Sequence, residues 1–162
     1  MTATVQPPLF GAQQEQLTSD DYYTPKWVFD AMGITFDLDV CAPPGGIPWI
    51  PADRYFTKAD DGLAQPWEGR VWMNPPFSDP SRWIAKFIEH RHGVALVPMA
   101  ASRWFRRLWD CDAPMTLYGE QDRAVFARND GERGIPTRVA LFAFGPECVE
   151  AISHLGVVRT VR

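Results

Sequence analysis

The feature that most constrains this chain is a short apolar run followed at once by two prolines. Residues 70–73 read Arg-Val-Trp-Met, and they are followed by Asn74, Pro75, Pro76 and Phe77. Proline has no amide hydrogen, and it disfavours helical geometry in the residue before it. The sequence therefore predicts a strand that ends abruptly in a rigid turn over residues 74–77, called the Asn-Pro-Pro-Phe turn below.

Strand-like and helix-like patterns alternate on both sides of this turn. We expect helices over residues 25–32, 80–91, 102–109 and 146–155, and strands over residues 36–42, 70–73, 93–99, 115–118, 124–127, 138–144 and 157–161. Thr24 and Pro25 have the form of an N-cap followed by proline at the first helical position. Residues 43–69, rich in Pro, Gly and Asp, show no helical pattern where a doubly wound fold would place a crossover helix. The sequence predicts a truncated, Rossmann-like α/β fold with a mainly parallel sheet and antiparallel pairing toward the C-terminus.

The length of 162 residues suits one domain, and 46% hydrophobic with 22% charged residues is typical of a globular protein. We expect a flexible N-terminal arm over residues 1–18 and a single domain over residues 19–162. No apolar run is long enough to span a bilayer, so a cytoplasmic location is expected. The three cysteines are far apart and predict neither disulfides nor a metal site, and the histidines show no ligand spacing.

Charge is distributed unevenly along the chain. Residues 1–69 contain three Lys/Arg and ten Asp/Glu, giving −7, whereas residues 70–162 contain thirteen and ten, giving +3. Candidate contacts to DNA phosphates are Arg82, Lys86, Arg103, Arg106 and Arg107, with tryptophans interleaved. The alternative is that these side chains are the solvated faces of two helices.

The Asn-Pro-Pro-Phe turn has a chemistry of its own. An exocyclic base amine is a poor nucleophile because its lone pair is delocalised into the ring, so acceptors must be aimed at its hydrogens. The side-chain oxygen of Asn74 and the carbonyl of Pro75 supply two acceptors, Pro76 stiffens the turn, and Phe77 offers a face for stacking. A base inside a duplex has to be flipped out to reach such a pocket. The turn thus favours methyl transfer from S-adenosyl-L-methionine to a base amine.

Several further motifs occur in one order along the chain, and through them the sequence resembles the phage-type DNA N-6-adenine methyltransferases (Dam-like) over about residues 20–145. The resemblance rests on the segments at residues 21–25, 36–42, 54–56, 61–63, 67–77 and 96–98, and on Trp104-Phe105. It implies that S-adenosyl-L-methionine is the cofactor and DNA the partner. It also implies a phage setting, and hence the bacterial host cytoplasm.

The resemblance also implies roles for cofactor-binding residues. The segment containing Tyr23, Thr24 and Pro25 would hold the methionine carboxylate, Asp39 the ammonium group, and Asp61 would lie near the nucleoside or adenine end. The acid that holds the ribose is open between Asp53 and Asp60. Each position also has a structural alternative: Thr24 as a helix cap, Asp39 as a turn cap, and the Asp60–Asp61 pair as a solvated turn.

The expected reaction is methylation of the amino nitrogen of adenine in DNA. Alternatives that share the motif are cytosine in DNA, adenine in RNA and a protein glutamine amide, and a different class is an inactive methyltransferase-like DNA-binding protein. No recognition domain is visible, so the arm before Ser19 and the loop over residues 128–136 are the candidates for reading a DNA site. The sequence does not specify an oligomeric state.

Overall fold

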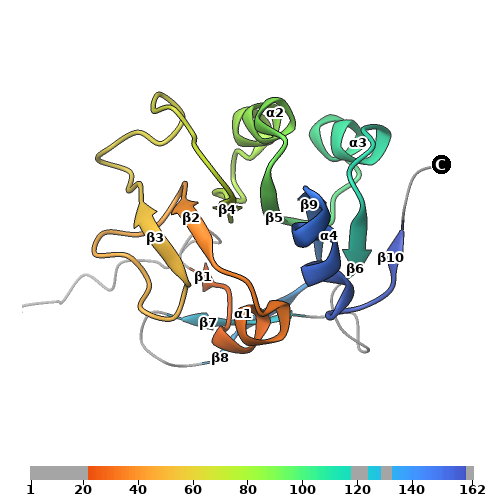
Figure 1. Ribbon diagram of the computed structural model, residues 1–162, viewed down its shortest axis with the longest axis horizontal. Helices are drawn as coiled ribbons and strands as arrows, with labels where there is room; N and C mark the ends of the chain where they lie inside the picture. Colours follow the sequence, from red (N-terminus) through yellow and green to blue (C-terminus); the bar gives the residue numbers. More distant parts are fainter. Residues whose placement is uncertain (1–21, 118–123, 129–132, 160–162) are drawn as a thin grey trace, which may run out of the picture.

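The main sheet of the computed structural model, which describes residues 22–117, 124–128 and 133–159, has seven strands in the order β10-β6-β9-β5-β4-β2-β3 (Figure 1). The strands are β2 (Phe36–Asp39), β3 (Ala52–Tyr55), β4 (Val71–Met73), β5 (Gly93–Pro98), β6 (Met115–Leu117), β9 (Val139–Phe144) and β10 (Val158–Arg159). Strands β3, β2, β4 and β5 pair in parallel. Strand β9 is antiparallel to both β5 and β6, so β6 runs in the direction of β5. Five of the seven strands share one direction, and the reversals involve β9 and β10, as predicted.

Four helices cover the two faces of this sheet (Figure 1). They are α1 (Lys26–Met32), α2 (Ser81–His90), α3 (Arg103–Asp110) and α4 (Pro146–Ser153). Helices α1 and α4 pack on one face, and α2 and α3 pack side by side on the other. Side chains of β5 alternate between the two faces: Val94 and Leu96 join the core under α1 and α4, whereas Ala95 and Val97 join the core under α2 and α3. The fold is a three-layer α/β/α arrangement.

A second, three-stranded sheet is made of β1 (Tyr22–Tyr23), β7 (Ala124–Arg128) and β8 (Arg133–Thr137), in the order β1-β7-β8. The prediction of a loop over residues 128–136 is wrong for Arg128, which is the last residue of β7, and for residues 133–136, which belong to β8. Residues 129–132 and the arm over residues 1–18 lie outside the described part of the chain. Because β1 pairs with β7, this sheet holds the residues that lead into Thr24.

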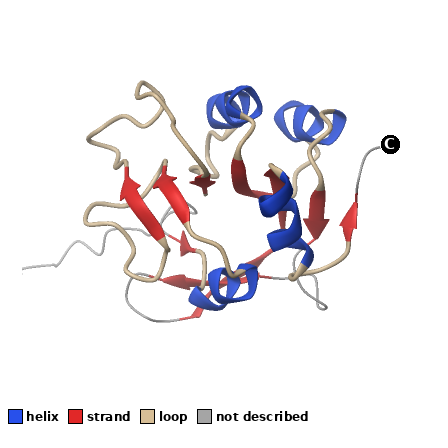
Figure 2. Cartoon of the chain, viewed as in Figure 1, coloured by secondary structure: helices blue, strands red, loops and turns tan. Residues whose placement is uncertain are grey.

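The connections between β2 and β4 are abbreviated as predicted, because the described residues 43–69 contain turns and no helix (Figure 2). They do contain one strand that the sequence pattern did not predict. Strand β3 is mostly exposed and pairs with β2 on one side alone, so it lacks the apolar run typical of a buried parallel strand.

Helix α1 begins one residue later than expected. Pro25 itself is the N-cap with an extended backbone, and no side chain caps the helix. The interpretation of Thr24 as a helix cap is therefore wrong, and its hydroxyl is available for another partner. No helix in the described ranges is long and apolar enough to cross a membrane.

Candidate active site

The candidate site lies where β2 and β4 reach their carboxyl ends. Asp39 is the last residue of β2 and is level with Trp72 of the neighbouring strand β4. Strand β4 ends at Met73, so the Asn-Pro-Pro-Phe turn begins at the same edge of the sheet. Ligands of open α/β sheets bind at this edge. The parallel pairing of β2 and β4 therefore brings the predicted cofactor acid and the predicted catalytic turn together.

Thr24 reaches this edge from the other direction along the chain. Its side chain is 1% exposed, and the Asn74 Nδ2 atom donates to its Oγ1 at 3.5 Å. The Thr24 carbonyl also accepts a hydrogen bond of 2.9 Å from the indole of Trp49. Because Nδ2 of Asn74 faces Thr24, its Oδ1 faces away and can accept a hydrogen from a ligand. Thr24 thus orients the amide of Asn74, a contact that the sequence did not predict.

Asp39 is a buried acid whose charge has no cationic partner in the part of the chain that the structure describes. Its side chain is 4% exposed, and among the described residues its carboxylate accepts one hydrogen bond, from the Cys41 amide to Oδ1 at 3.1 Å. Burial raises the pKa of Asp39 to about 7, although the hydrogen bond from Cys41 opposes the shift. A carboxyl of this kind is stabilised in its charged form by an incoming cation. The geometry suits an ammonium group.

Cys41 connects Asp39 to the turn. While its amide donates to Asp39, its thiol donates to the Asn74 carbonyl at 2.9 Å. Pro75 and Pro76 have no amide hydrogens, so the turn has fewer donors of its own to fix its backbone. Burial raises the pKa of the Cys41 thiol well above its ordinary value, which keeps it protonated as a donor. The sequence pattern places Cys41 in the expected strand over residues 36–42 and does not indicate this contact, because Asn74 is 33 residues away.

Asp60 and Asp61 lie in an exposed turn that is pressed against the end of β2. A side chain at Gly62 would overlap the carbonyl oxygen of Val40, so only glycine permits this approach. The Asp60 carboxylate accepts bonds from the amide and hydroxyl of Thr57, which lower its pKa. One of its oxygens is thereby engaged within the turn. Asp61 has a positive φ of 51° and an exposed side chain beside the site.

Lys86 holds the far side of the same turn. Its ammonium group donates to the carbonyls of Gly62, Leu63 and Gln65, and it lies 4.9 Å from the centre of the Trp67 ring. An ammonium group has three hydrogens, so these carbonyls use them all. This arrangement gives Lys86 a structural role, because its ammonium group has no hydrogen left to donate to a DNA phosphate.

The remaining predicted site residues differ in how deeply they are buried. Pro75 is buried, Pro76 is half-buried, and Phe77 is partly buried against the core under α1 and α4. Tyr23 pairs with Ala127 in the small sheet and leads directly into Thr24. Asp53 is exposed in the middle of the edge strand β3, two residues before its carboxyl end.

The predicted basic residues of α2 and α3 face solvent. Arg82, Arg103 and Arg107 are exposed and form no ion pair with another described residue. Arg106 forms an exposed pair with Asp110, with 2.8 Å between Nε and Oδ2. Exposed pairs of this kind are weak, so a phosphate can compete for the guanidinium.

A different polar cluster lies at the amino end of β5. His92, Glu147 and Cys148 bring their ligand atoms within 4.8 Å of one another, although the sequence gave no metal-ligand spacing. Glu147 already accepts a 2.7 Å bond from His92, and its Oε1 is 3.7 Å from the guanidinium of Arg70. Burial raises the pKa of Cys148 to about 12. A neighbouring guanidinium and a protonated thiol disfavour a cation here.

A buried acid suited to a cation and a proline-stiffened turn with carbonyl acceptors thus share the ligand edge of a Rossmann-like sheet. Fold and site define an α/β enzyme of the amino-methyltransferase class. The DNA N-6-adenine-methyltransferase (Dam) family model matches residues 11–137. The "DNA N-6-adenine-methyltransferase" of Haemophilus phage HP1 is 31% identical over 122 residues, which cover 68% of this chain and 68% of the relative. No solved structure gives a significant match. The chain belongs to the DNA N-6-adenine-methyltransferase (Dam) family.

Proposed function

We propose that this protein transfers a methyl group from S-adenosyl-L-methionine to the exocyclic amino nitrogen of adenine in DNA. The observation that carries the proposal is the contact between Asn74 and Thr24, which leaves Oδ1 of Asn74 directed away from Thr24 at the ligand edge of the sheet. Family membership supports adenine in DNA as the acceptor. Cytosine, RNA and protein amides become outcomes of the test below.

The residues present fit the proposed cofactor. Asp39 is buried and has a single backbone donor among the described residues, so the ammonium group of the methionine moiety would complete its pairing. The segment around Thr24 and Pro25 contacts Asn74 at the same edge of the sheet and remains our assignment for the carboxylate. Asp61 lies on the turn that Gly62 brings to the end of β2, which suits the nucleoside end. Asp60 is engaged with Thr57, and Asp53 is the less constrained candidate for the ribose.

The chain's own contribution to the chemistry is orientation. The bound cofactor supplies an electrophilic methyl group on sulfur. Oδ1 of Asn74 and the carbonyl of Pro75 accept the two amino hydrogens of adenine, which directs the nitrogen lone pair toward that methyl group. The amino nitrogen would carry a positive charge once methylated, and it would then lose one proton to solvent. No strong base is needed, because the methylated amine is acidic before that proton leaves.

The proposed DNA contacts are Arg82, Arg103, Arg106 and Arg107. All four are exposed on α2, which follows β4 directly after the Asn-Pro-Pro-Phe turn, and on α3, which follows the neighbouring strand β5. Guanidinium groups in such positions neutralise phosphates without reading sequence. Affinity for DNA should therefore fall steeply with salt.

The test is to incubate the protein with unmethylated DNA and labelled S-adenosyl-L-methionine, hydrolyse the DNA and identify the labelled nucleoside. We expect label in 6-methyladenine with the wild type, and a loss of about 100-fold or more with Asn74→Ala, as for removal of a transition-state hydrogen-bonding group. Calorimetry of cofactor binding to the variant is the control, because a variant that still binds the cofactor is folded. Label in cytosine, in RNA or in protein would redirect the assignment. No label anywhere, despite cofactor binding, would overturn it in favour of an inactive binder.

The phage relative supports a phage setting and action in the bacterial host cytoplasm. In that setting, methylation would protect phage DNA from restriction. Phage DNA made in the presence of the protein should resist a methylation-sensitive nuclease, and DNA made with Asn74→Ala should be cut. Equal cutting of both DNAs would count against this role.

A further inference from the structure

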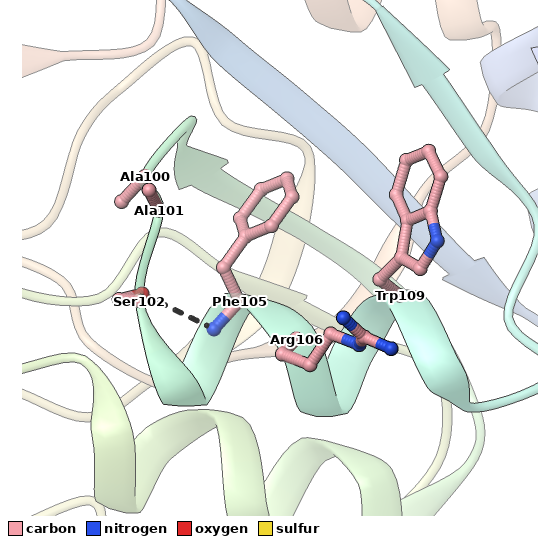
Figure 3. Close-up of a pocket in the computed structure, with 6 residues that line it drawn as sticks. All are labelled: Ala100, Ala101, Ser102, Phe105, Arg106 and Trp109. Atoms are coloured by element: carbon pink, nitrogen blue, oxygen red, sulfur yellow. Dashed lines mark hydrogen bonds between the residues drawn. The ribbon is translucent and has the colours of Figure 1, made fainter.

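A groove lies on the surface of α3, the helix that follows β5. It is lined by Ala100, Ala101, Ser102, Phe105, Arg106 and Trp109, and its volume is about 440 Å³ (Figure 3). Strand β5, which ends at Pro98 and leads into the groove, is the immediate neighbour of β4 in the sheet, and the groove runs from Ala100 along α3 to Trp109. Adjacent strands are about 4.8 Å apart. A DNA strand that crosses the carboxyl end of β5 on its way to Asn74 would meet the start of the groove at Ala100.

The shape of the groove follows from the sequence around the start of α3. Ala100 and Ala101 have the smallest side chains that a non-glycine residue offers, and Ser102 uses its hydroxyl to cap the helix at the Phe105 amide. Three consecutive small residues therefore leave space in front of the helix. Phe105 and Trp109 are four residues apart and project to the same side of α3, as Figure 3 shows. They form an aromatic wall above the floor of small residues.

The two rings differ in what already contacts them. Phe105 packs edge-on against Phe142, with 5.8 Å between the ring centres, so it is anchored in the core. Trp109 is 37% exposed, which is unusual for a residue of its size. The guanidinium of Arg159 lies 3.7 Å from the centre of the Trp109 ring. Trp109 is therefore an aromatic ring with one face covered by a guanidinium and more than a third of its surface exposed.

The charge around the groove is positive. Arg103, Arg106 and Arg107 of α3 and Arg159 of β10 are opposed within these two elements by Asp110 alone. Arg106 lines the groove and is paired with Asp110 at the surface, with 74% of its side chain exposed. A ligand for such a site has a flat apolar part and a negative part, which are the base and the phosphate of a nucleotide.

We propose that this groove binds one nucleotide of the DNA substrate next to the target adenine, with its base against Phe105 and Trp109 and its phosphate on Arg106. The inference rests on the proposed function and deepens it by assigning a second base-binding position. Holding a neighbouring nucleotide outside the stack would keep the target base from returning to the duplex. Because aromatic stacking tolerates every base, this contact adds affinity with little sequence preference.

The test uses a fluorescently labelled oligonucleotide that contains one target adenine, as a single strand and as a duplex, with anisotropy as the binding readout. Trp109→Ala should raise the dissociation constant about tenfold, as expected from the loss of one base stack. Arg91→Ala, at the amino end of β5, is the matched surface control, because Arg91 is also an exposed arginine paired with an aspartate. It should leave binding unchanged within twofold.

A second series of experiments changes the DNA and not the protein, by removing a base next to the target adenine. Oligonucleotides with an abasic site on either side of the target adenine are compared with the intact one. At one flanking position, the abasic site should weaken binding of the oligonucleotide to the wild type about tenfold. The same abasic site should hardly change binding to Trp109→Ala, because the effects of two groups that contact each other are not additive in a double-mutant cycle. Ala101→Trp, which fills the groove from outside without removing a core contact, should weaken binding as well, whereas Ala101→Ser should not.

Equal binding by wild type, Trp109→Ala and Ala101→Trp would overturn the groove assignment, as would fully additive effects at both flanking positions. Because the readout is binding, this outcome is separate from a failure of the proposed function. A wild type that binds the oligonucleotides with the expected coupling but methylates none of them would retain the groove and overturn the enzymatic assignment.

Discussion

The two ends of the parallel strands differ in how their polar groups are paired. At the amino ends, Asp37 accepts from the Arg70 amide at 2.5 Å, His92 pairs with Glu147, and Arg91 pairs with Asp112. These side chains are exposed or half-buried. At the carboxyl ends, Thr24 and Asp39 are buried, and their local partners satisfy only part of their hydrogen-bonding capacity.

This difference distinguishes polar groups that stabilise the fold from polar groups that are available to bind a ligand. Paired surface groups add small increments to stability and lose little when one is removed. A buried, incompletely paired carboxyl opposes folding, because its charge is taken out of water without full compensation. It persists where a ligand completes the pairing, so the carboxyl ends are where the fold gives up stability for binding.

The largest expected effect on cofactor binding comes from Asp39→Asn, which removes the charge but keeps the oxygen that accepts from Cys41. Affinity for S-adenosyl-L-methionine should fall roughly 10- to 100-fold, because a hydrogen bond to a charged group contributes about 1.5–3 kcal/mol. Titration calorimetry at pH 7.5 measures it. Undiminished affinity would show that another group binds the ammonium.

The same variant tests whether the site reduces stability. Since the pKa of Asp39 in the folded state, about 7, lies above its ordinary 3.8, its ionisation opposes folding as the pH rises from 4 through 7. At pH 8 without cofactor, Asp39→Asn should therefore be more stable than wild type, by at most about 4 kcal/mol. Denaturant titrations at pH 5 and pH 8 measure this, and a gain that is larger at pH 5 would contradict it.

A second prediction concerns pH and binding in the wild type. The cofactor's ammonium group pairs with the ionised form of Asp39, so the dissociation constant should rise by about tenfold for each pH unit below about 7. Between pH 5.5 and 7.5, Asp39→Asn should show a flat profile and serves as the control. A flat wild-type profile would mean that Asp39 is already ionised throughout this range.

Cys41 has an intermediate effect, because it acts through Asn74. Cys41→Ala removes the thiol donor but keeps the amide bond to Asp39, so kcat should fall by roughly 2- to 10-fold while cofactor affinity is unchanged. Cys41→Ser keeps a donor and should recover most of the rate. Steady-state kinetics with both variants measures the difference. An equal loss in Ala and Ser variants would indicate that packing, and not the hydrogen bond, is responsible.

The smallest effect belongs to the amino ends. The hydrogen bond from His92 lowers the pKa of Glu147, so this carboxylate contributes stability above its unfolded pKa, and the contribution is lost as pH falls through the folded pKa. Glu147→Gln should destabilise the protein at pH 7 by less than about 1 kcal/mol, with the difference closing below about pH 4. Methylation should be unaffected. A large loss of activity would mean that the two ends are coupled.

Local patterns predicted most of the elements and the outline of the site. Residues 70–77 specified a strand, a turn and their chemistry, because prolines act on their immediate neighbours whatever surrounds them. Helices α2 and α3 were evident from apolar spacing. Strand β3 was missed because its pairing with β2 alone leaves it exposed, and part of β8 was taken for a loop.

Long-range contacts were beyond the same reasoning. Lys86 looked like a phosphate contact in a basic segment, and its engagement by three carbonyls depends on how residues 62–65 fold back over α2. Likewise, Cys41 and Asn74 are 33 residues apart, and nothing local to either indicates a hydrogen bond.

The shape of the Asn-Pro-Pro-Phe turn is therefore determined by its local sequence, whereas the residues that surround it are determined by tertiary packing. Backbone restriction and apolar periodicity are local properties, so the amino-acid sequence is enough to specify the turn, the alternating elements and the kind of chemistry. Which groups are buried and which donors are left over depends on strand order and register, which follow from burying both faces of the sheet at once. That packing brought Thr24, Asp39 and Cys41 to the strand ends around Asn74 and shaped the groove along α3.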